Sequence, residues 1–230
     1  SDIVAVGRYP YTGFRGSLRP EDKVVIHEAL RACHLDGMQE RLYSTLSDGE
    51  KQRVMIARAL AQETPLILLD EPTAHLDLPS RLEVTTMLRT LARSLGKSIL
   101  ISTHELDLAL GWADTIWLMD REGKVTASAP EDLILDGHIE RVFGAPTLSY
   151  DQERGEFSIR QSGGKKIYLR GEGLRYIWTS RALQRLGYEV TASTGAYPEV
   201  ALTEGAWELA LPSGKRSVYP SITALLGALP

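Results

Sequence analysis

The chain has 230 residues, enough for one large domain or two modest ones, each with its own hydrophobic core. Its apolar content of 43% and charged content of 24% are ordinary for a globular protein, and a net charge of −4 argues against direct nucleic-acid binding. No apolar run is long enough to cross a bilayer, and the single cysteine, Cys33, excludes an internal disulfide and is expected to be a buried helix residue.

Two helices are predicted in the first third of the chain. Pro20, followed by two acidic residues, starts a helix that runs to about Cys33, because proline and acids are favoured in a first turn. Ser47 and Glu50 have the spacing of a capping box and start a second helix. Residues 1–19 contain glycine and proline and are expected to form a loop after a short helical turn.

The hydrophobic pattern then changes. Leu66–Leu69 and Ile99–Ile101 are unbroken apolar runs, typical of parallel strands covered on both faces. Between them, residues 80–95 carry apolar side chains at helical spacing, and Gly96 ends that helix. A short helix is expected at 105–112. The alternation of strand, helix and strand predicts a parallel sheet with helices packed on it.

A hairpin and a second domain are predicted further along. Thr115–Met119 and Lys124–Ala127 are expected to pair across a glycine-containing turn. An amphipathic helix near Leu174–Leu186 and a last helix at 220–228 are accompanied by short strand-like runs. These runs are Phe157–Arg160, Lys166–Arg170, Tyr188–Ser193, Glu199–Thr203 and Trp207–Leu211. We therefore expect a small α+β domain over residues 146–230.

The sequence of this second domain contains no metal-ligand cluster, no nucleophile–base set and no glycine-rich phosphate loop. Trp178 and Trp207 are expected to lie in its core rather than to stack on a ligand, because large aromatic side chains contribute much of the buried area of a small domain. The sequence therefore predicts no chemistry of its own for this domain.

Two carboxylates directly follow the first predicted strand. Asp70 and Glu71 stand at its carboxyl end, the edge where open α/β sheets bind ligands. One carboxylate there can hold Mg²⁺, which prefers hard oxygen ligands, and the other can orient or deprotonate an attacking water. His104 follows the second strand in the same way and can donate a hydrogen bond to a phosphate oxygen. Taken alone, the acidic pair is equally compatible with a solvated loop.

The start of the second helix is a candidate phosphate site. The free backbone N–H groups and the positive end of the helix dipole favour an anion there. Gly49 allows close approach of the backbone, and the Ser47 hydroxyl can donate a hydrogen bond. A plain capping box is the simpler interpretation of the same residues. The phosphate interpretation gains support because this helix leads directly into the acidic strand.

In combination, these motifs resemble those of the ATP-binding subunits of ABC transporters. Leu46–Glu50 is similar to the signature motif and Leu66–Glu71 to the Walker B strand. Ala74–Asp77 is similar to the D-loop and His104 to the switch histidine. The resemblance covers about residues 1–145 and is strongest to importers of iron-siderophores, haem or vitamin B12.

The resemblance implies a fold class. Residues 1–145 are expected to be the later part of an α/β P-loop NTPase domain. Within it, a helical subdomain would occupy about residues 20–62 and the remainder of the catalytic core residues 63–145. Residues 146–230 would form the accessory α+β domain.

The resemblance also implies roles, with ATP and Mg²⁺ as cofactors. Glu71 would activate water, His104 would sense the γ-phosphate and Asp70 would hold Mg²⁺. Four further residues would contact the nucleotide across a dimer or link its two sites: Ser47, Gly49, Glu50 and Asp77. The implied partners are a second ATPase subunit and transmembrane permease subunits, with no nucleic acid, at the cytoplasmic face of the inner membrane.

Two residues depart from the pattern of the family. Asp48 stands where the signature motif usually has its first glycine, and His75 stands where serine is commoner in the D-loop. The Asp48 carboxylate could repel a phosphate or could face solvent at the helix N-terminus, where acids are favoured.

The glycine-rich loop that holds phosphates in P-loop proteins is not found. Gly96-Lys97-Ser98 is the nearest fragment, but it lies between a helix and a strand, the reverse of the required order. The family's glutamine loop is not seen either. The sequence thus predicts a chain shortened at its N-terminus, which alone is inactive. The alternatives are a non-catalytic ABC-like regulator or scaffold, and a soluble ABC ATPase of translation or DNA repair.

Overall fold

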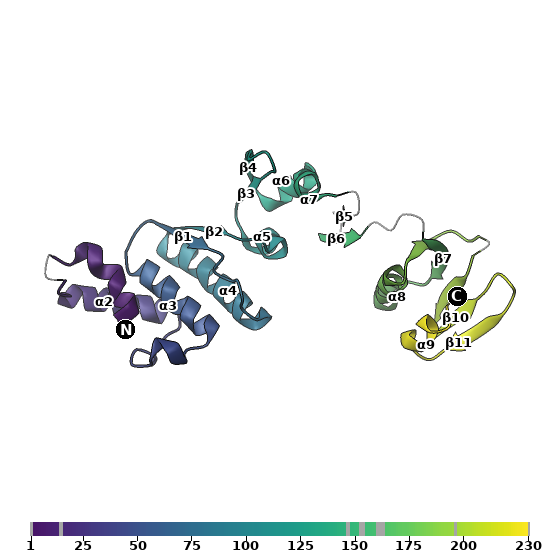
Figure 1. Cartoon of the computed structure of the whole chain (residues 1–230), viewed down its shortest axis with the longest axis horizontal. Helices are drawn as coiled ribbons and strands as arrows, with labels where there is room; N and C mark the ends of the chain where they lie inside the picture. Colours follow the sequence, from purple (N-terminus) through teal and green to yellow (C-terminus); the bar gives the residue numbers. More distant parts are fainter. Residues whose placement is uncertain are drawn as a thin grey trace. The chain divides into compact units, whose positions relative to one another are not determined.

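The computed structural model describes residues 2–13, 16–145, 148–151, 155–159, 164–195 and 197–229. The chain divides into two compact units, residues 1–136 and 137–230 (Figure 1). Each unit has its own hydrophobic core. The domain boundary expected after residue 145 and the extent of the helical subdomain stay predictions.

Helices open the first unit. They are α1 (Asp2–Ala5), the 3₁₀ helix η1 (Val6–Tyr11), α2 (Pro20–Ala32), the 3₁₀ helix η2 (Tyr43–Thr45) and α3 (Asp48–Leu60). The predicted starts of α2 and α3 are confirmed, with Pro20 in the first turn of α2 and Ser47 as the N-cap of α3. Cys33 is fully buried as expected, and burial raises the pKa of its thiol to about 12.

The Arg8 side chain explains why η1 extends the short helical turn predicted near the start of the chain. It is buried, and its Nε donates to Asp22 Oδ1 at 2.9 Å. Its Nη1 donates to the Ala61 carbonyl oxygen at 2.8 Å and to Glu63 Oε2 at 2.6 Å. The Tyr11 ring lies against the guanidinium, 3.9 Å away. One buried cation therefore joins η1 to the start of α2 and the end of α3.

Strands and helices alternate in the rest of the first unit. They are β1 (Leu66–Asp70), α4 (Leu78–Leu95), β2 (Ser98–Ser102), α5 (Leu106–Trp112), β3 (Ile116–Met119), β4 (Val125–Ser128) and α6 (Pro130–Leu135). β1 and β2 pair in parallel and β3 and β4 form a hairpin, as predicted. Gly96 ends α4 with a positive φ of 60°. The α6 helix was not predicted, although Pro130 with its two following acids repeats the starting pattern of α2.

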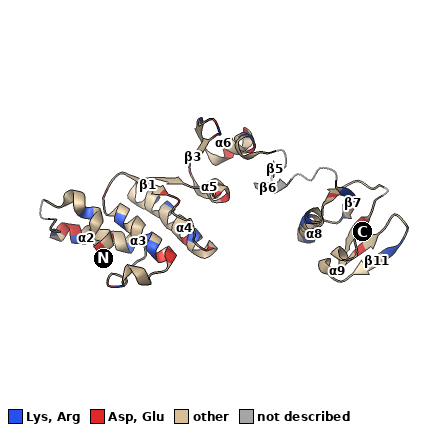
Figure 2. Cartoon of the chain, viewed as in Figure 1, with Lys and Arg blue, Asp and Glu red and all other residues tan. Residues whose placement is uncertain are grey.

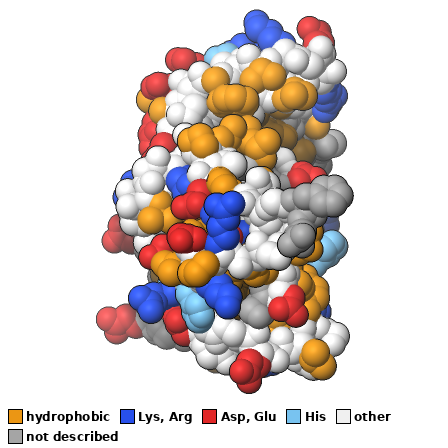
Figure 3. All heavy atoms as spheres, turned by 90° about the vertical axis from the view of Figure 1, so that its left-hand side faces the viewer, with side chains coloured by type: hydrophobic (Ala, Val, Ile, Leu, Met, Phe, Trp, Pro, Cys, Tyr) orange, Lys and Arg blue, Asp and Glu red, His pale blue; other side chains and the backbone are white. Residues whose placement is uncertain are grey.

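The expectation that the strands of the parallel pair are covered on both faces is wrong for the described residues. Ile67 is buried and Leu69 packs against the core formed by the helices. Leu68 points the other way and is 67% exposed. Successive side chains of a strand point to opposite faces, and here the helical core covers one of them. Seen from the left-hand side of Figure 1, hydrophobic side chains lie between charged ones on the surface (Figure 3).

A five-stranded sheet dominates the second unit. The elements are α7 (His138–Phe143), β5 (Leu148–Asp151), β6 (Glu156–Ile159), β7 (Lys165–Arg170), α8 (Gly173–Arg185), β8 (Tyr188–Thr191), β9 (Glu199–Thr203), β10 (Ala206–Ala210), β11 (Arg216–Tyr219) and α9 (Ile222–Leu226). The sheet has the order β11-β10-β9-β7-β8, and β7 is parallel to both of its neighbours. This is the expected α+β arrangement. β5, β11 and α7 were not predicted.

The two faces of this sheet differ in chemistry. One face forms a core with α8 and α9, in which Ile167, Leu183 and Leu225 are fully buried. The other carries ion pairs between neighbouring strands, and Figure 2 shows the acidic and basic residues along them. The pairs are Lys166–Glu189 at 3.9 Å, Arg170–Glu199 at 3.4 Å and Arg216–Glu208 at 3.4 Å.

The two tryptophans near α8 behave differently. Trp207 packs against the core, and its indole N–H donates to the buried Thr179 hydroxyl at 2.8 Å. The prediction that Trp178 lies in the core is wrong, because its ring is on the outer side of α8 and is 57% exposed. The Arg181 guanidinium covers part of that ring, 5.1 Å from its centre.

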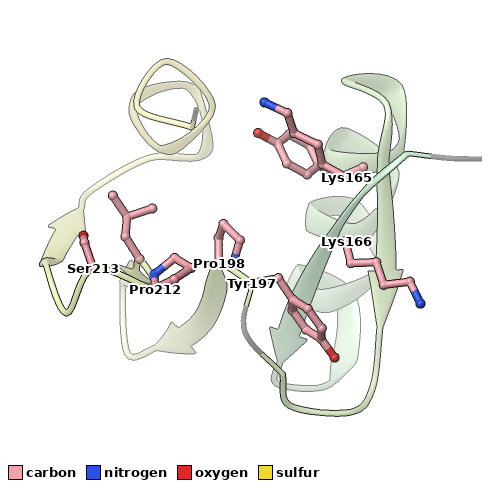
Figure 4. A pocket seen from close by; sticks show the side chains of 8 residues that line it. Lys165, Lys166, Tyr197, Pro198, Pro212 and Ser213 are labelled. Carbon is pink, nitrogen blue, oxygen red and sulfur yellow. The ribbon is translucent and has the colours of Figure 1, made fainter.

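An open hollow of about 480 Å³ lies at the end of the sheet where β7 begins and β10 ends (Figure 4). Lys165 and Lys166 leave the strand in different directions there, as successive strand residues do. Pro198, Pro212 and Ser213 line the opposite wall. None of the described helices of either unit is long and apolar enough to span a membrane.

We expect Leu183→Ala to destabilise the second unit by about 3 kcal/mol, because it leaves a cavity in a fully packed core. Urea denaturation followed by tryptophan fluorescence of the whole chain measures this loss. The matched variant Leu174→Ala, on the exposed side of the same helix, should have almost no effect. Equal losses for the two variants would contradict the described packing of α8.

Stability of the first unit should fall in acid through Asp22. Hydrogen bonds from the Arg19 backbone N–H and from the Arg8 side chain lower the pKa of this carboxyl. A carboxyl whose pKa is lowered by folding stabilises the fold at pH values above its ordinary pKa near 4. This contribution is lost as the pH falls through the lowered pKa. Urea midpoints taken from about pH 6 down to about pH 3 should therefore fall less steeply for Asp22→Asn than for the unaltered chain. Identical slopes would contradict this role.

Candidate functional site

The parallel register of β1 and β2 brings three predicted site residues to one edge of the sheet. Asp70 ends β1 opposite Ser102, the last residue of β2. Glu71 and His104 follow these strand ends, and His104 Nδ1 lies 3.2 Å from Glu71 Oε1. Both side chains are accessible, with 48% of Glu71 and 70% of His104 exposed. The edge therefore presents two carboxylates and an imidazole to solvent.

Ser102 is a site residue that the sequence analysis missed. Its hydroxyl donates a hydrogen bond to Asp70 Oδ1. The backbone N–H of Glu71 is shared between the Ser102 carbonyl oxygen at 3.1 Å and the Ser102 hydroxyl oxygen at 3.2 Å. Glu71 has a positive φ of 44°, a backbone conformation that is uncommon outside glycine. The strand register, together with the polar side chain two residues before His104, was the signal that could have found it.

Glu105 was also missed, and it connects the loop after β2 to the loop after β1. One of its carboxylate oxygens lies 3.2 Å from Arg81 Nε, and the other accepts from the Thr73 hydroxyl at 3.4 Å. Arg81 also donates to the Leu76 carbonyl oxygen at 3.2 Å. The segment that resembles the D-loop is thus held between Thr73 and α4, next to the segment that carries the histidine.

The predicted capping box at the start of α3 is confirmed. Ser47 Oγ accepts from the Glu50 backbone N–H at 3.2 Å, and Glu50 Oε2 accepts from the Ser47 N–H at 2.7 Å. The Ser47 N–H, and after it the Arg41 side chain, lower the pKa of Glu50. The Asp48 side chain faces solvent, 73% exposed, and pairs with Lys51 at 3.0 Å.

The starts of α3 and α4 approach each other closely. A Cβ atom added to Gly49 would lie 3.2 Å from both Cβ and Oγ of Ser80 on α4. Asp77 is the N-cap of α4 and accepts from the Ser80 N–H at 3.1 Å, and hydrogen bonds from Ser80 lower its pKa. The site residues therefore form two groups, one at the strand ends and one around these two helix starts, which contains Ser47, Gly49, Glu50 and Asp77.

The donor set at the strand edge fits Mg²⁺. Magnesium takes hard oxygen ligands and commonly binds one or two protein carboxylates together with phosphates of a nucleotide and water. Asp70 supplies such a carboxylate at an exposed edge. Within the described part of the chain, no group of three or more His, Cys, Asp or Glu could hold a metal by itself. An ion that draws most of its ligands from a bound phosphate is compatible with this arrangement.

Comparison with known families gives two matches. Residues 7–74 match the ABC transporter family, and residues 164–230 match the iron ABC transporter C-terminal domain. The first match, in the unit that carries the strand edge and the capped helix, confirms the resemblance to ABC transporter ATPases. The second match is more specific, so the chain has one segment similar to ABC transporters and another similar to the C-terminal domain of iron ABC transporters.

Individual relatives agree with these matches. An uncharacterised ABC transporter ATP-binding protein of Methanocaldococcus jannaschii is 35% identical over 170 residues, 73% of this chain and 59% of that protein. The achromobactin transport ATP-binding protein of Dickeya dadantii is 38% identical over 141 residues, 61% of this chain and 52% of that protein. The chain therefore spans between half and three-fifths of the length of these curated relatives.

A solved structure supports the fold. A metal-chelate type ABC transporter in an inward-facing conformation matches with a TM-score of 0.59 at 28% identity, covering 68% of this chain and 62% of that one. The first unit accordingly has the fold of part of a P-loop ABC ATPase cassette.

Ser47→Ala should destabilise the first unit by about 1 kcal/mol, because the Glu50 N–H loses its side-chain acceptor. Ser47→Asp should retain most of the stability, because aspartate is an equally good N-cap. Urea denaturation followed by circular dichroism tests both variants. A loss of stability with aspartate equal to that with alanine would contradict the capping role.

Proposed function

We propose that this chain belongs to the ATP-hydrolysing subunit of an ABC importer, with an iron-siderophore, haem or related metal chelate as the transported substrate. The observation that carries the proposal is the edge where Asp70, Glu71 and His104 meet, in the unit whose residues 7–74 match the ABC transporter family. The match to the iron ABC transporter C-terminal domain favours the substrate class.

The three residues suit hydrolysis of a phosphoanhydride. Mg²⁺, when bound with ATP, neutralises charge that develops on the phosphates. Asp70 would hold that ion through its carboxylate. Glu71 would orient a water molecule and accept its proton, and the exposure of its carboxylate beside the same strand end supports this role.

His104 suits a role between the general base and the γ-phosphate. Its Nδ1 faces the Glu71 carboxylate, which can only accept a hydrogen bond when ionised, so Nδ1 carries the proton in that contact. A hydrogen bond to a phosphate oxygen requires a proton on Nε2. The two ring nitrogens of His104 would therefore face Glu71 on one side and a phosphate oxygen on the other.

The partners follow from the two groups of site residues. The group around the starts of α3 and α4 would contact ATP held by a second copy of the subunit, so that two subunits enclose the nucleotide. Asp77, which caps α4 beside Gly49, would connect the two sites. Transmembrane permease subunits would bind this pair at the cytoplasmic face of the membrane.

The experiment is a Glu71→Gln substitution in the complete gene product. We expect ATP turnover to fall by a factor of about 100 or more, because the amide cannot accept the proton of the attacking water, while ATP stays bound. Phosphate release and retention of labelled nucleotide measure the two effects. Glu122→Gln, at the turn of the β3–β4 hairpin, serves as the control and should retain full turnover.

Two results would overturn the assignment. Unchanged hydrolysis by Glu71→Gln would remove Glu71 from the chemistry. Absence of any hydrolysis by the unaltered complete protein would favour the regulator or scaffold instead of the ATPase.

A further inference from the structure

We propose that Ser102 is the positioning residue for both acidic residues of the site, an inference that rests on the proposed ATPase function. Its hydroxyl joins the carboxylate expected to hold Mg²⁺ to the backbone of the residue expected to act as general base. Without this side chain, Asp70 and Glu71 would stay at the strand end but would lose their common orientation.

The contact with Asp70 sets the direction of that carboxylate. The Ser102 hydroxyl donates to Asp70 Oδ1, so this oxygen is engaged within the protein and Oδ2 is the one left for an outside ligand. Asp70 is exposed at the strand end, where packing constrains a side chain less than a hydrogen bond does. A hydrogen bond to a charged acceptor is stronger than one between neutral groups, so the bond from Ser102 can orient the Asp70 carboxylate by itself.

The contact with Glu71 supports an unfavourable backbone conformation. Glu71 has a φ of 44°, and a non-glycine residue keeps such a conformation only when the surroundings hold it. The Glu71 N–H is held by two oxygens of Ser102, and the Glu71 carbonyl oxygen accepts from the Ala74 N–H at 3.0 Å. This backbone turn directs the Glu71 side chain towards His104, 3.2 Å away.

The chemistry of the two contacts restricts which side chains can replace serine. At one oxygen the hydroxyl donates to Asp70 and accepts from Glu71, and only a hydroxyl of this length does both. Ser102 is exposed at the end of β2, so the extra methyl group of threonine has room, and threonine is favoured in strands. Threonine should therefore replace serine, whereas alanine should not.

The first test uses this chain without nucleotide, so that it does not depend on ATPase activity. Hydrogen–deuterium exchange of the Glu71 amide should be about 3- to 10-fold faster in Ser102→Ala, the range expected for loss of one hydrogen bond while the backbone bond to the Ser102 carbonyl remains. Ser102→Thr should restore the original rate. Ser98→Ala, at the other end of the same strand and opposite Leu66, is the matched control and should leave the rate unchanged.

The second test uses the complete gene product with ATP. Ser102→Ala should lower kcat and raise the Mg²⁺ concentration needed for half-maximal turnover, each by about 10-fold, while the affinity for ATP measured by equilibrium binding stays the same. Ser102→Thr should restore both values. A merely structural role would lower the amount of folded protein without changing the Mg²⁺ requirement.

The outcomes separate this inference from the proposed function. If exchange responds as expected but the unaltered protein hydrolyses no ATP, the positioning by Ser102 stands and the ATPase proposal fails. If the unaltered protein hydrolyses ATP and Ser102→Ala matches Ser98→Ala in exchange rate, kcat and Mg²⁺ requirement, the positioning role is overturned and the ATPase proposal stands.

Discussion

The candidate site depends on one constraint, the parallel register that places the last residue of β1 opposite the last residue of β2. Parallel strands joined by a helix end at the same edge of a sheet, so the residues that follow them meet although more than thirty positions of sequence separate Asp70 from Ser102. At this edge the two strands are joined by hydrogen bonds of the Ser102 side chain as well as by the backbone hydrogen bonds of the sheet. A shift of one residue in the register would send Ser102 to the other face of the sheet.

Local patterns in the sequence were sufficient wherever the physical cause is local. The capping box of Ser47 and Glu50 and the end of α4 at Gly96 depend on residues within one turn, and both appear in the structure as predicted. The edge with Asp70, Glu71 and His104 was also predictable, because it needs only two strands and the rule that they run in parallel.

Features that depend on distant contacts could not be predicted from the sequence. The contact of Glu105 with Thr73 and Arg81 joins two loops, and no spacing rule connects these residues. The exposure of Trp178 depends on which side of α8 meets the sheet. The buried residues Thr179, Ala182 and Leu183 define that side, and Trp178 does not belong to it. For Gly49, closeness to a phosphate was expected, whereas the structure adds closeness to Ser80.

The approach of α3 to α4 has a mechanical consequence. The helices touch at their starts through Gly49 and Ser80, and one turn further along Arg53 and Glu83 form an ion pair of 3.0 Å. Two points of attachment along neighbouring helices resist both sliding and rotation. The two helices should therefore move as one rigid body. A displacement of the capped start of α3 would then also move the loop before α4.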